Sequence, residues 1–202
     1  IKDFGTPKRL KKVNFEQKLS NRKKISAVFL DRDGVINEDK GYVHQIKDFT
    51  FIPGIFQLCI DAMSKDYLIF VITNQAGIGR GYYTSCDFNV LNNWMCNEFL
   101  KRGISITDVY YSPYHPIFGQ GDYKLDEHTR KPNPGMLQLA NKDYGIDFSK
   151  SVLIGDKITD IRAGQNAGVS CNLLLSTDEF TEINVCKNYY IINSLEAGCS
   201  FL

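Results

Sequence analysis

The 202-residue sequence lacks the features that direct a chain to secretion or into a membrane. It has no hydrophobic leader, and no apolar run reaches the roughly 18 residues that a spanning helix needs. Its six cysteines include no CxxC pair, so neither a disulfide framework nor a paired-cysteine metal motif is indicated. We therefore expect a cytoplasmic protein with reduced thiols and no membrane contact.

An overall excess of charge of either sign is also lacking, because the net charge is only +1. The charge is nevertheless unevenly spread. Residues 1–24 carry nine Lys and Arg against Asp3 and Glu16, which leaves 15 basic and 21 acidic residues in the rest of the chain, a balance of −6. We predict a basic leader or linker over 1–24 and one domain of ordinary size over 25–202, present as a monomer. The acidic body argues against a nucleic-acid partner.

From residue 25 onward, short apolar runs alternate with amphipathic stretches. Runs such as YLIFVIT (67–73) and SVLIG (151–155) are apolar on successive residues, as in strands that are covered on both faces. The segment 88–99 repeats apolar residues at helical spacing. This rhythm predicts an α/β fold, a doubly wound parallel sheet of Rossmann-like type. YYIINSL (189–195) predicts a late edge strand, and 113–130 reads as a long loop.

The residues that follow each predicted strand are polar. In a doubly wound sheet ligands bind outside the carboxyl ends of the strands, so these positions are candidates for a site. They are Asp31, Asp33 and Gly34 after VFL, Thr73 and Asn74 after FVI, Asp156, Lys157 and Asp160 after LIG, and Arg130 and Lys131 ahead of the GMLQLA helix. Each of these short patterns alone is common in surface turns and helix caps. Their succession at four places in order predicts one site.

Three carboxylates on one rim repel each other unless a cation lies among them, and oxygen ligands favour Mg²⁺. The neighbouring Lys131 and Lys157, with the hydroxyl of Thr73, offer donors for a phosphate group. In such a site Asp31 can attack phosphorus to form an acyl phosphate, and Asp33 can serve as general acid and base. The residues therefore predict magnesium-dependent phosphoryl transfer.

These motifs resemble those of the haloacid dehalogenase superfamily, whose four motifs are matched by DRDGVIN, TN, K and GDKxxD. More narrowly, GYVH, TNQAGIGRG, RKPNPGM and GDKITDI resemble the D-glycero-D-manno-heptose 1,7-bisphosphate phosphatase and histidinol-phosphatase family. The resemblance runs from about Ala27 to Leu195. It implies a minimal cap, since no large insertion separates DRDGVIN from TNQ.

The resemblance also implies a role for each matching residue. Asp31 would be nucleophile and Mg²⁺ ligand, Asp33 would be the acid and base and bind the metal through its carbonyl, and Asp156 would be the third ligand. Thr73 and Lys131 would stabilise the transferring phosphoryl group. Asp160 would orient Lys157 or metal-bound water. The substrate would be bound by Asp39, Lys40, Gly41, Tyr42, Asn74, Gln75, Ala76, Arg80, Arg130 and Lys157.

One part of the family pattern is missing. Many members hold a structural zinc through a CxH pair and a later CxC pair before RKP, but here these stretches read SPYH (112–115) and EHTR (127–130). We therefore expect no zinc, although His115, Glu127 and His128 are residues of metal-binding type. The loop would be held by ordinary contacts or be partly mobile. The candidates for such contacts are Tyr110, Tyr111, Tyr114 and Tyr123.

The leader has its own weak resemblance. KDFGTP (2–7) followed by Arg9 and Leu10 is similar to the closing segment of sugar-phosphate nucleotidyltransferases, which suggests fusion to, or association with, such an enzyme. The alternative is a solvated basic helix over 7–22. No aromatic residues alternate with its charges in the manner of nucleic-acid binders.

The favoured function is removal of one phosphate from a small sugar bisphosphate, with heptose 1,7-bisphosphate of nucleotide-heptose, lipopolysaccharide or capsule biosynthesis preferred. Histidinol phosphate of histidine biosynthesis is the alternative within the family. A polynucleotide 3′-phosphatase shares the motifs but fits the acidic body poorly. Two other classes remain. One is a phospho-acceptor signalling domain, a class without an acid and base at the position of Asp33. The other is a catalytically silent interaction domain, which the intact motif set opposes.

Overall fold

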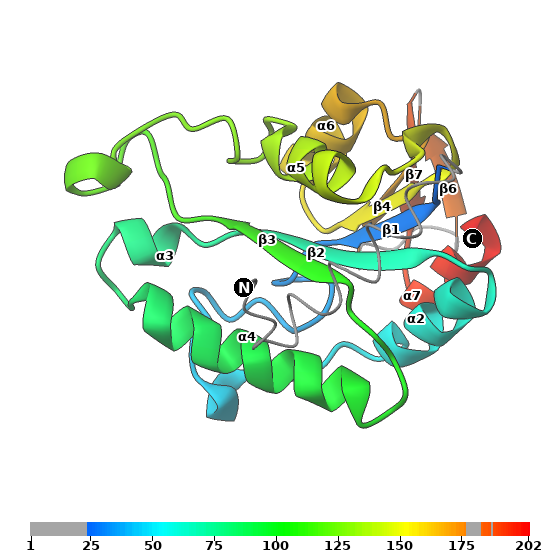
Figure 1. Cartoon of the computed structure of the whole chain (residues 1–202), viewed down its shortest axis with the longest axis horizontal. Helices are drawn as coiled ribbons and strands as arrows, with labels where there is room; N and C mark the ends of the chain where they lie inside the picture. Colours follow the sequence, from blue (N-terminus) through cyan, green and yellow to red (C-terminus); the bar gives the residue numbers. More distant parts are fainter. Residues whose placement is uncertain (1–23, 177–182, 187) are drawn as a thin grey trace, which may run out of the picture.

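The computed structural model describes residues 24–176, 183–186 and 188–202 (Figure 1). The predicted basic leader lies outside this part of the chain except for Lys24, so its helix and its link to a nucleotidyltransferase stay predictions. The larger helices are α2 (Ile55–Ser64), α4 (Ser85–Leu100), α5 (Gly135–Tyr144) and α6 (Ile158–Ala167), with short α3 (Ala76–Gly79) and α7 (Leu195–Gly198). The 3-10 turns are η1 (Ile46–Asp48), η2 (Gly121–Tyr123), η3 (Phe148–Lys150) and η4 (Cys199–Phe201).

The described strands form one seven-stranded sheet in the order β3-β2-β1-β4-β5-β7-β6. They are β1 (Ala27–Leu30), β2 (Leu68–Asn74), β3 (Asp108–Ser112), β4 (Val152–Gly155), β5 (Cys171–Leu175), β6 (Ile183–Cys186) and β7 (Tyr189–Ile192). Every pairing is parallel except that of β6 with β7. The chain adds β2 and β3 on one side of β1, and then adds β4 and the later strands on the other side. The predicted doubly wound parallel sheet is confirmed, and its switch point lies between β1 and β4.

The sheet is covered on both faces, as its apolar strands require (Figure 1). One core packs α2, α4 and α7 against the sheet, and the other packs α5 and α6 against the opposite face. The predicted helical spacing in α4 is confirmed, because the residues buried by that helix are Phe88, Leu91, Met95 and Phe99. Thr84 and Asp87 begin this helix with a capping box.

One strand prediction is wrong in detail. The segment 189–195 was expected to form an edge strand, but β7 pairs with β5 on one side and with β6 on the other. The edge strand is β6, a four-residue element whose sequence, INVC, is too short to give a clear periodic signal. It turns back antiparallel and so covers the edge that β7 would otherwise expose.

Only η1 and α2 stand between β1 and β2. A large cap is therefore absent from this position, and the carboxyl ends of the strands open to the loops that follow them. Among the described residues, no helix is both long enough and apolar enough to cross a membrane.

Candidate active site

Polar side chains from three strands meet at the carboxyl edge of the sheet. Asp31 follows β1, and its backbone N–H donates to the carbonyl of Ile154 in β4 at 3.0 Å. The parallel register of β1 with β2 and β4 brings Asp31 beside Thr73 and Asp156. A cavity of ≈ 480 Å³ opens at this edge. Of the predicted residues, those that line it are Asp31, Asp33, Asp39, Gly41, Tyr42, Thr73, Asn74, Gln75, Ala76, Arg80, Arg130, Lys131, Lys157 and Asp160.

Three carboxylates gather at this edge of the sheet: Asp31 and Asp160 line the cavity, and Asp156 lies beside them in the lining of a neighbouring hollow. Asp31, Asp156 and Asp160 place oxygen atoms within 4.8 Å of one another. Asp156 Oδ1 is buried and has no hydrogen-bond partner, and burial raises the pKa of Asp156. Gly34 allows the approach, since its φ of +91° is in the left-handed region and a Cβ there would overlap the Asp156 carboxylate. An unsatisfied carboxylate oxygen beside two further carboxylates fits a hard divalent cation such as Mg²⁺.

Lys131 offsets part of this negative charge. Its ammonium lies 2.8 Å from Asp31 Oδ1 and 2.6 Å from Asp160 Oδ1, and donates to the carbonyl of Ile72 at 3.1 Å. Burial opposes protonation of Lys131, but the two carboxylates outweigh it and raise its pKa. Asn74 holds the backbone of Lys131 through two hydrogen bonds of 3.0 and 3.1 Å. Asn74 therefore positions Lys131, in addition to lining the cavity.

The candidate nucleophile is almost completely enclosed. Asp31 is 6% exposed, and burial raises its pKa to about 7 even though Lys131 acts in the opposite direction. Asp160 raises it further. Asp31 Oδ1 also accepts the backbone N–H of Arg32 at 2.7 Å. A cation among these carboxylates would lower the cost of keeping Asp31 ionised.

Asp160 contacts Lys131 through the lysine side chain and Lys157 through the backbone. It was expected to orient Lys157 or metal-bound water; its Oδ1 pairs with Lys131, and its Oδ2 accepts the backbone N–H of Lys157 at 2.9 Å. The contact with metal-bound water stays a prediction. The Lys157 ammonium instead lies 2.8 Å from Asp39 Oδ2 and 3.4 Å from Asp156 Oδ2. The physical reason is that Asp160 sits in the first turn of α6, where its carboxylate caps the helix.

Asp33 accepts hydrogen bonds from three side chains. Arg32 Nη2 lies 2.9 Å from Oδ2 and 3.0 Å from Oδ1, and it also donates to the carbonyl of Val43 at 2.6 Å. Asn37 Nδ2 donates to Oδ1 at 3.0 Å, and Gln75 Nε2 donates to Oδ2 at 3.1 Å. These contacts fix the carboxylate while leaving its side chain 18% exposed. Asp33 is therefore oriented by Arg32 and Asn37 from the loop after β1 and by Gln75 directly after β2.

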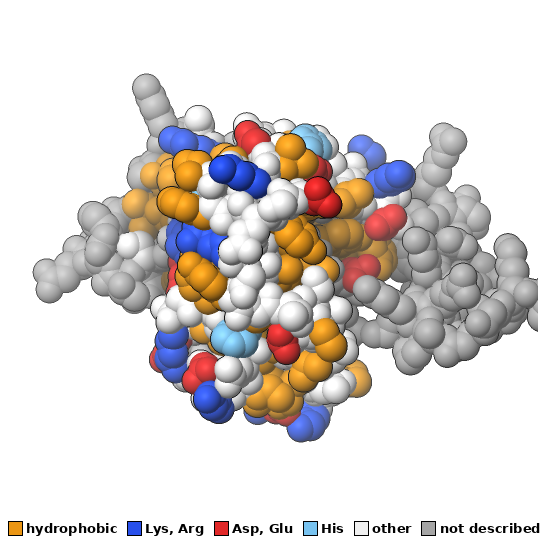
Figure 2. All heavy atoms as spheres, turned by 90° about the vertical axis from the view of Figure 1, so that its left-hand side faces the viewer, with side chains coloured by type: hydrophobic (Ala, Val, Ile, Leu, Met, Phe, Trp, Pro, Cys, Tyr) orange, Lys and Arg blue, Asp and Glu red, His pale blue; other side chains and the backbone are white. Residues whose placement is uncertain are grey.

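The far rim of the cavity carries cations among aromatic rings. The Arg80 guanidinium lies 5.5 Å from the Tyr42 ring centroid and 4.5 Å from that of Phe118. Arg130 Nη1 donates to the carbonyl of Tyr114 at 2.9 Å, and burial with the nearby charge of Arg80 lowers its pKa. Figure 2 looks onto this end of the molecule, where blue Lys and Arg side chains lie among orange hydrophobic ones. Two arginines at one rim favour an anionic group.

Lys40 is the predicted substrate contact that the structure does not bring to the cavity. Its ammonium donates to Thr50 Oγ1 at 2.8 Å and lies 3.1 Å from Glu38 Oε2. The loop turns here because Asp39 Oδ1 accepts the N–H of Gly41, which has a positive φ of 75°. This turn directs Asp39 and Gly41 to the cavity and Lys40 away from it. Lys40 is therefore not part of the cavity lining, and its contact with substrate stays a prediction.

Several residues at the site had no motif to point to them. Tyr83, His115 and Thr159 line the cavity, and Arg32 lies behind Asp33 with only 1% exposure. Arg32 and Thr159 are exceptions, because they lie within the DRDGVIN and GDKITDI motifs; for Arg32, a basic residue between two candidate carboxylates was the available signal. Tyr83 and His115 come from loops whose paths the sequence does not specify.

The loop after β3 is organised without the family's zinc ligands. His115 Nδ1 accepts the backbone N–H groups of Ile117 and Phe118 at 3.2 and 3.1 Å. The rings of Tyr114 and Tyr123 lie 5.8 Å apart. Of the other predicted contacts, Tyr110 instead donates to Asp143 Oδ2 and Tyr111 packs on Phe88. His128 contacts Gln138 through Nε2 at 2.8 Å, so the three candidate metal ligands of this loop do not form a cluster among the described residues.

Comparisons with known proteins agree with this geometry. A family model described as HAD-hydrolase-like matches residues 128–197. The D-glycero-alpha-D-manno-heptose-1,7-bisphosphate 7-phosphatase of Burkholderia mallei is 46% identical over 170 residues, covering 84% of this chain and 90% of that protein. The corresponding beta-anomer 7-phosphatase of Photorhabdus laumondii is 42% identical, covering 85% of this chain and 92% of that protein.

Solved structures show the same fold. A protein from Mesorhizobium loti described as a HAD-like phosphatase has a TM-score of 0.78 and 30% identity, and the match covers 88% of each chain. A D,D-heptose 1,7-bisphosphate phosphatase from B. bronchiseptica, solved with magnesium and phosphate, has a TM-score of 0.74 and 23% identity. That match covers 87% of this chain and 97% of the other.

Proposed function

Since this chain belongs to the heptose-1,7-bisphosphate 7-phosphatase family of haloacid dehalogenase-like hydrolases, we propose that it removes the 7-phosphate from D-glycero-D-manno-heptose 1,7-bisphosphate. The observation that carries this proposal is the cavity itself. Its floor holds the buried pair of Asp31 and Lys131, and its rim holds Arg80 and Arg130. One end is suited to phosphoryl transfer and the other to a second anionic group. The similar relatives include enzymes named for both anomers, so the proposal extends to either.

The carboxylates of Asp31 and Asp156, with the backbone carbonyl of Asp33, would hold Mg²⁺. The orphaned Asp156 Oδ1 supports this assignment. Asp160 is less suited to bind the cation, because both of its oxygens are already used, by Lys131 and by the Lys157 N–H. When bound, the cation supplies positive charge that offsets repulsion between the carboxylates and the incoming phosphate.

In the first half of the reaction, a carboxylate oxygen of Asp31 attacks phosphorus and the bond from phosphorus to the sugar oxygen breaks. Lys131 and the Thr73 hydroxyl stabilise the transferring phosphoryl oxygens. Asp33, protonated at this stage, gives its proton to the leaving oxygen, so the products are a sugar hydroxyl and an acyl phosphate on Asp31.

In the second half, water attacks the same phosphorus and the bond to Asp31 breaks. Asp33, now a carboxylate, takes a proton from that water. Inorganic phosphate leaves, and Asp31 returns as a carboxylate beside Lys131 while Asp33 is protonated again. The hydrogen bonds that fix Asp33 allow one side chain to serve both halves, since its carboxyl group stays in one place.

The proposal is tested by magnesium-dependent phosphate release from heptose 1,7-bisphosphate, heptose 7-phosphate and histidinol phosphate. We expect the bisphosphate to have the highest kcat/KM, because only it can use both ends of the cavity. Asp31→Asn should lower kcat by at least about 10⁴-fold while leaving the fold intact. Asp61→Asn, a change on α2 outside the cavity lining, serves as the control. Histidinol phosphate turned over as well as the bisphosphate would refute the substrate assignment.

A further inference from the structure

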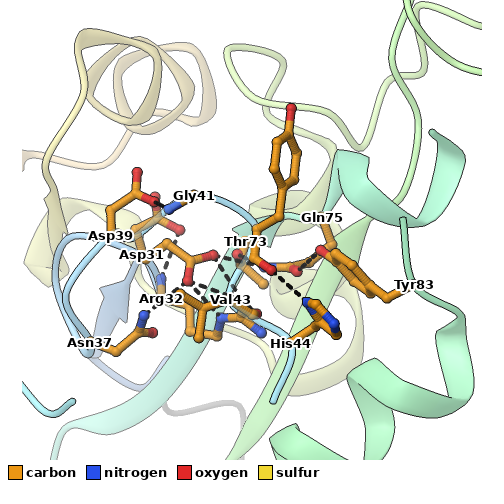
Figure 3. Close-up of polar contacts among 12 residues, drawn as sticks. Asp31, Arg32, Asn37, Asp39, Gly41, Val43, His44, Thr73, Gln75 and Tyr83 are labelled. Carbon is orange, nitrogen blue, oxygen red and sulfur yellow. Dashed lines mark hydrogen bonds and ion pairs between the residues drawn. The ribbon is translucent and has the colours of Figure 1, made fainter. Parts of the chain in front are cut away.

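Both the nitrogen and the oxygen of the Gln75 side-chain amide are hydrogen-bonded within the protein. It lies 1% exposed at the end of β2 (Figure 3). Its Nε2 donates to Thr73 Oγ1 at 2.8 Å and to Asp33 Oδ2 at 3.1 Å, and its Oε1 accepts the hydroxyl of Tyr83 at 2.6 Å. An amide nitrogen has two hydrogens, so both are engaged. Gln75 therefore links the candidate acid and base to the hydroxyl expected to contact phosphate.

Asp33 and Tyr83, which lie on either side of Gln75, determine which group of its amide donates and which accepts. In the stage where Asp33 is a carboxylate it can only accept, so Gln75 must then present its nitrogen to it. Gln75 Oε1 then faces Tyr83, whose hydroxyl must donate. Burial raises the pKa of Tyr83 to about 12, so this hydroxyl keeps its proton. Because Thr73 Oγ1 accepts from Gln75, its own hydrogen is available to a phosphate oxygen.

Tyr83 is fixed on several sides. It is 6% exposed, and its ring stacks on His44 with centroids 4.9 Å apart and planes 4° apart. Gly77 at the start of α3 makes room for it, since a Cβ there would overlap the tyrosine ring. The ring also packs in a small cluster with Ile78 and Phe88. The hydroxyl is therefore held at Gln75 by packing that is separate from the floor of the active site.

We infer that Gln75, with its amide orientation locked by Tyr83, is a positioning residue that keeps Asp33 placed for proton transfer and turns the Thr73 hydroxyl toward the phosphoryl group. This inference rests on the roles that the proposed function gives to Asp33 and Thr73. It assigns Gln75 a part in the chemistry, in place of the direct sugar contact expected from the sequence. Neither Gln75 nor Tyr83 touches the reacting atoms, so both act through their neighbours.

Without the Tyr83 hydroxyl, the orientation of the Gln75 amide would no longer be fixed. Without its donor, the amide can rotate and place Oε1 against the Asp33 carboxylate, where two acceptors repel. The Thr73 hydroxyl could then donate to Oε1 and no longer to phosphate. Both consequences slow the chemical steps and leave the rim of the cavity, with Arg80 and Arg130, unchanged. The defect should therefore appear in kcat and not in KM.

The test compares Tyr83→Phe with Tyr111→Phe. Tyr111 packs near the same cluster and does not line the cavity, which makes it a matched loss of one hydroxyl. With heptose 1,7-bisphosphate, Tyr83→Phe should lower kcat about tenfold and change KM less than about twofold. Gln75→Glu, which replaces the donating NH₂ by an oxygen, should lower kcat about 10²-fold. Thermal unfolding of each variant reports whether it is folded.

Leaving-group dependence separates the positioning role from general damage. p-Nitrophenyl phosphate needs little protonation of its leaving oxygen, so it is affected only through the Thr73 hydroxyl, and kcat/KM of Tyr83→Phe for it should fall at most about threefold. Equal losses of kcat/KM for the two substrates, kinetics matching Tyr111→Phe, or a higher KM with unchanged kcat would each overturn the inference. Turnover of the bisphosphate by the wild-type enzyme tests the proposed function separately. The comparison of Tyr83→Phe with Tyr111→Phe on p-nitrophenyl phosphate tests the positioning role of Gln75 and Tyr83, whichever sugar is the substrate.

Discussion

The floor and the rim of the cavity are built in different ways. At the floor, Asp31, Thr73 and Lys131 are 6%, 1% and 2% exposed. Asp31 and Thr73 lie at the ends of strands, and Lys131 donates to a strand carbonyl. At the rim, Phe118 is 57% exposed and Arg80 is held by ring faces. The floor is therefore rigid and independent of the sugar, whereas the rim is made of loops that can differ between relatives. Chemistry should depend on the floor, and substrate choice should depend on the rim.

Among the changes that compare the floor with the rim, the largest expected effect comes from removing the ammonium group of Lys131 at the floor. Lys131→Met leaves Asp31 and Asp160 facing each other without their shared partner, so kcat should fall about 10²- to 10³-fold for every phosphate ester tested. Stability measured by urea unfolding without Mg²⁺ should fall by about 3 kcal/mol. Lys142→Met, an exposed change on α5, is the matched control. A loss confined to the bisphosphate would break the distinction between floor and rim.

The next effect concerns pH and Mg²⁺ at the floor. Burial raises the pKa of Asp31 from 3.8 to about 7, and a cation binds the carboxylate form. The metal-free fold therefore loses stability as pH rises from about 4 to 7, and Mg²⁺ restores it. Apparent Mg²⁺ affinity, measured by calorimetric titration, should weaken by up to about tenfold per pH unit below 7.

Asp31→Asn supplies the control for this dependence on pH, because it removes the titrating carboxylate. The variant should bind Mg²⁺ more weakly, and its affinity should vary much less between pH 5.5 and 7.5. An affinity in the wild-type protein that stays constant across this range would contradict the assignment of Asp31 as a ligand.

A smaller effect is expected at the rim. Arg80→Met should raise KM for heptose 1,7-bisphosphate about tenfold, because one charge-assisted contact with the second phosphate is lost. It should leave kcat/KM for heptose 7-phosphate within about twofold. Arg162→Met, an exposed change on α6, is the matched control. Equal losses with the two sugars would show that Arg80 serves the floor, and the comparison of the two regions would fail.

The smallest effect concerns the loop that carries the rim. His115→Ala removes the acceptor of the Ile117 and Phe118 N–H groups, so hydrogen exchange in this loop should quicken, with global stability lower by at most about 1 kcal/mol. His115→Asn can keep an oxygen where Nδ1 was and should retain most of the protection. Slow exchange in His115→Ala would show that other contacts hold the loop.

The same contrast explains what the sequence could predict. Asp31, Thr73 and Asp156 were predictable because the carboxyl ends of buried parallel strands meet at one edge of the sheet. That Lys40 lies outside the cavity lining was not predictable, because a turn at Asp39 and Gly41 decides which side chains face inward and a motif does not encode that direction. Tyr83 and His115 were missed because they reach the cavity through loop packing over long distances in the sequence.

The edge of the sheet shows the same limit. Strand β7 was predicted from its apolar run, but its place inside the sheet depends on β6, whose four residues pair with it and give little signal of their own. Local patterns therefore predicted which elements exist, and long-range pairing decided where the last of them lie.

The central claim is that Asp31 carries the phosphoryl group during turnover. The direct test is to mix the enzyme with Mg²⁺ and heptose 1,7-bisphosphate, quench it in acid within the first turnovers, digest it and locate the added phosphoryl mass by tandem mass spectrometry. The account predicts that this mass lies on Asp31 and disappears when the substrate is exhausted. A phosphoryl group found on another residue, or turnover with no phosphorylated peptide at any time, would contradict it.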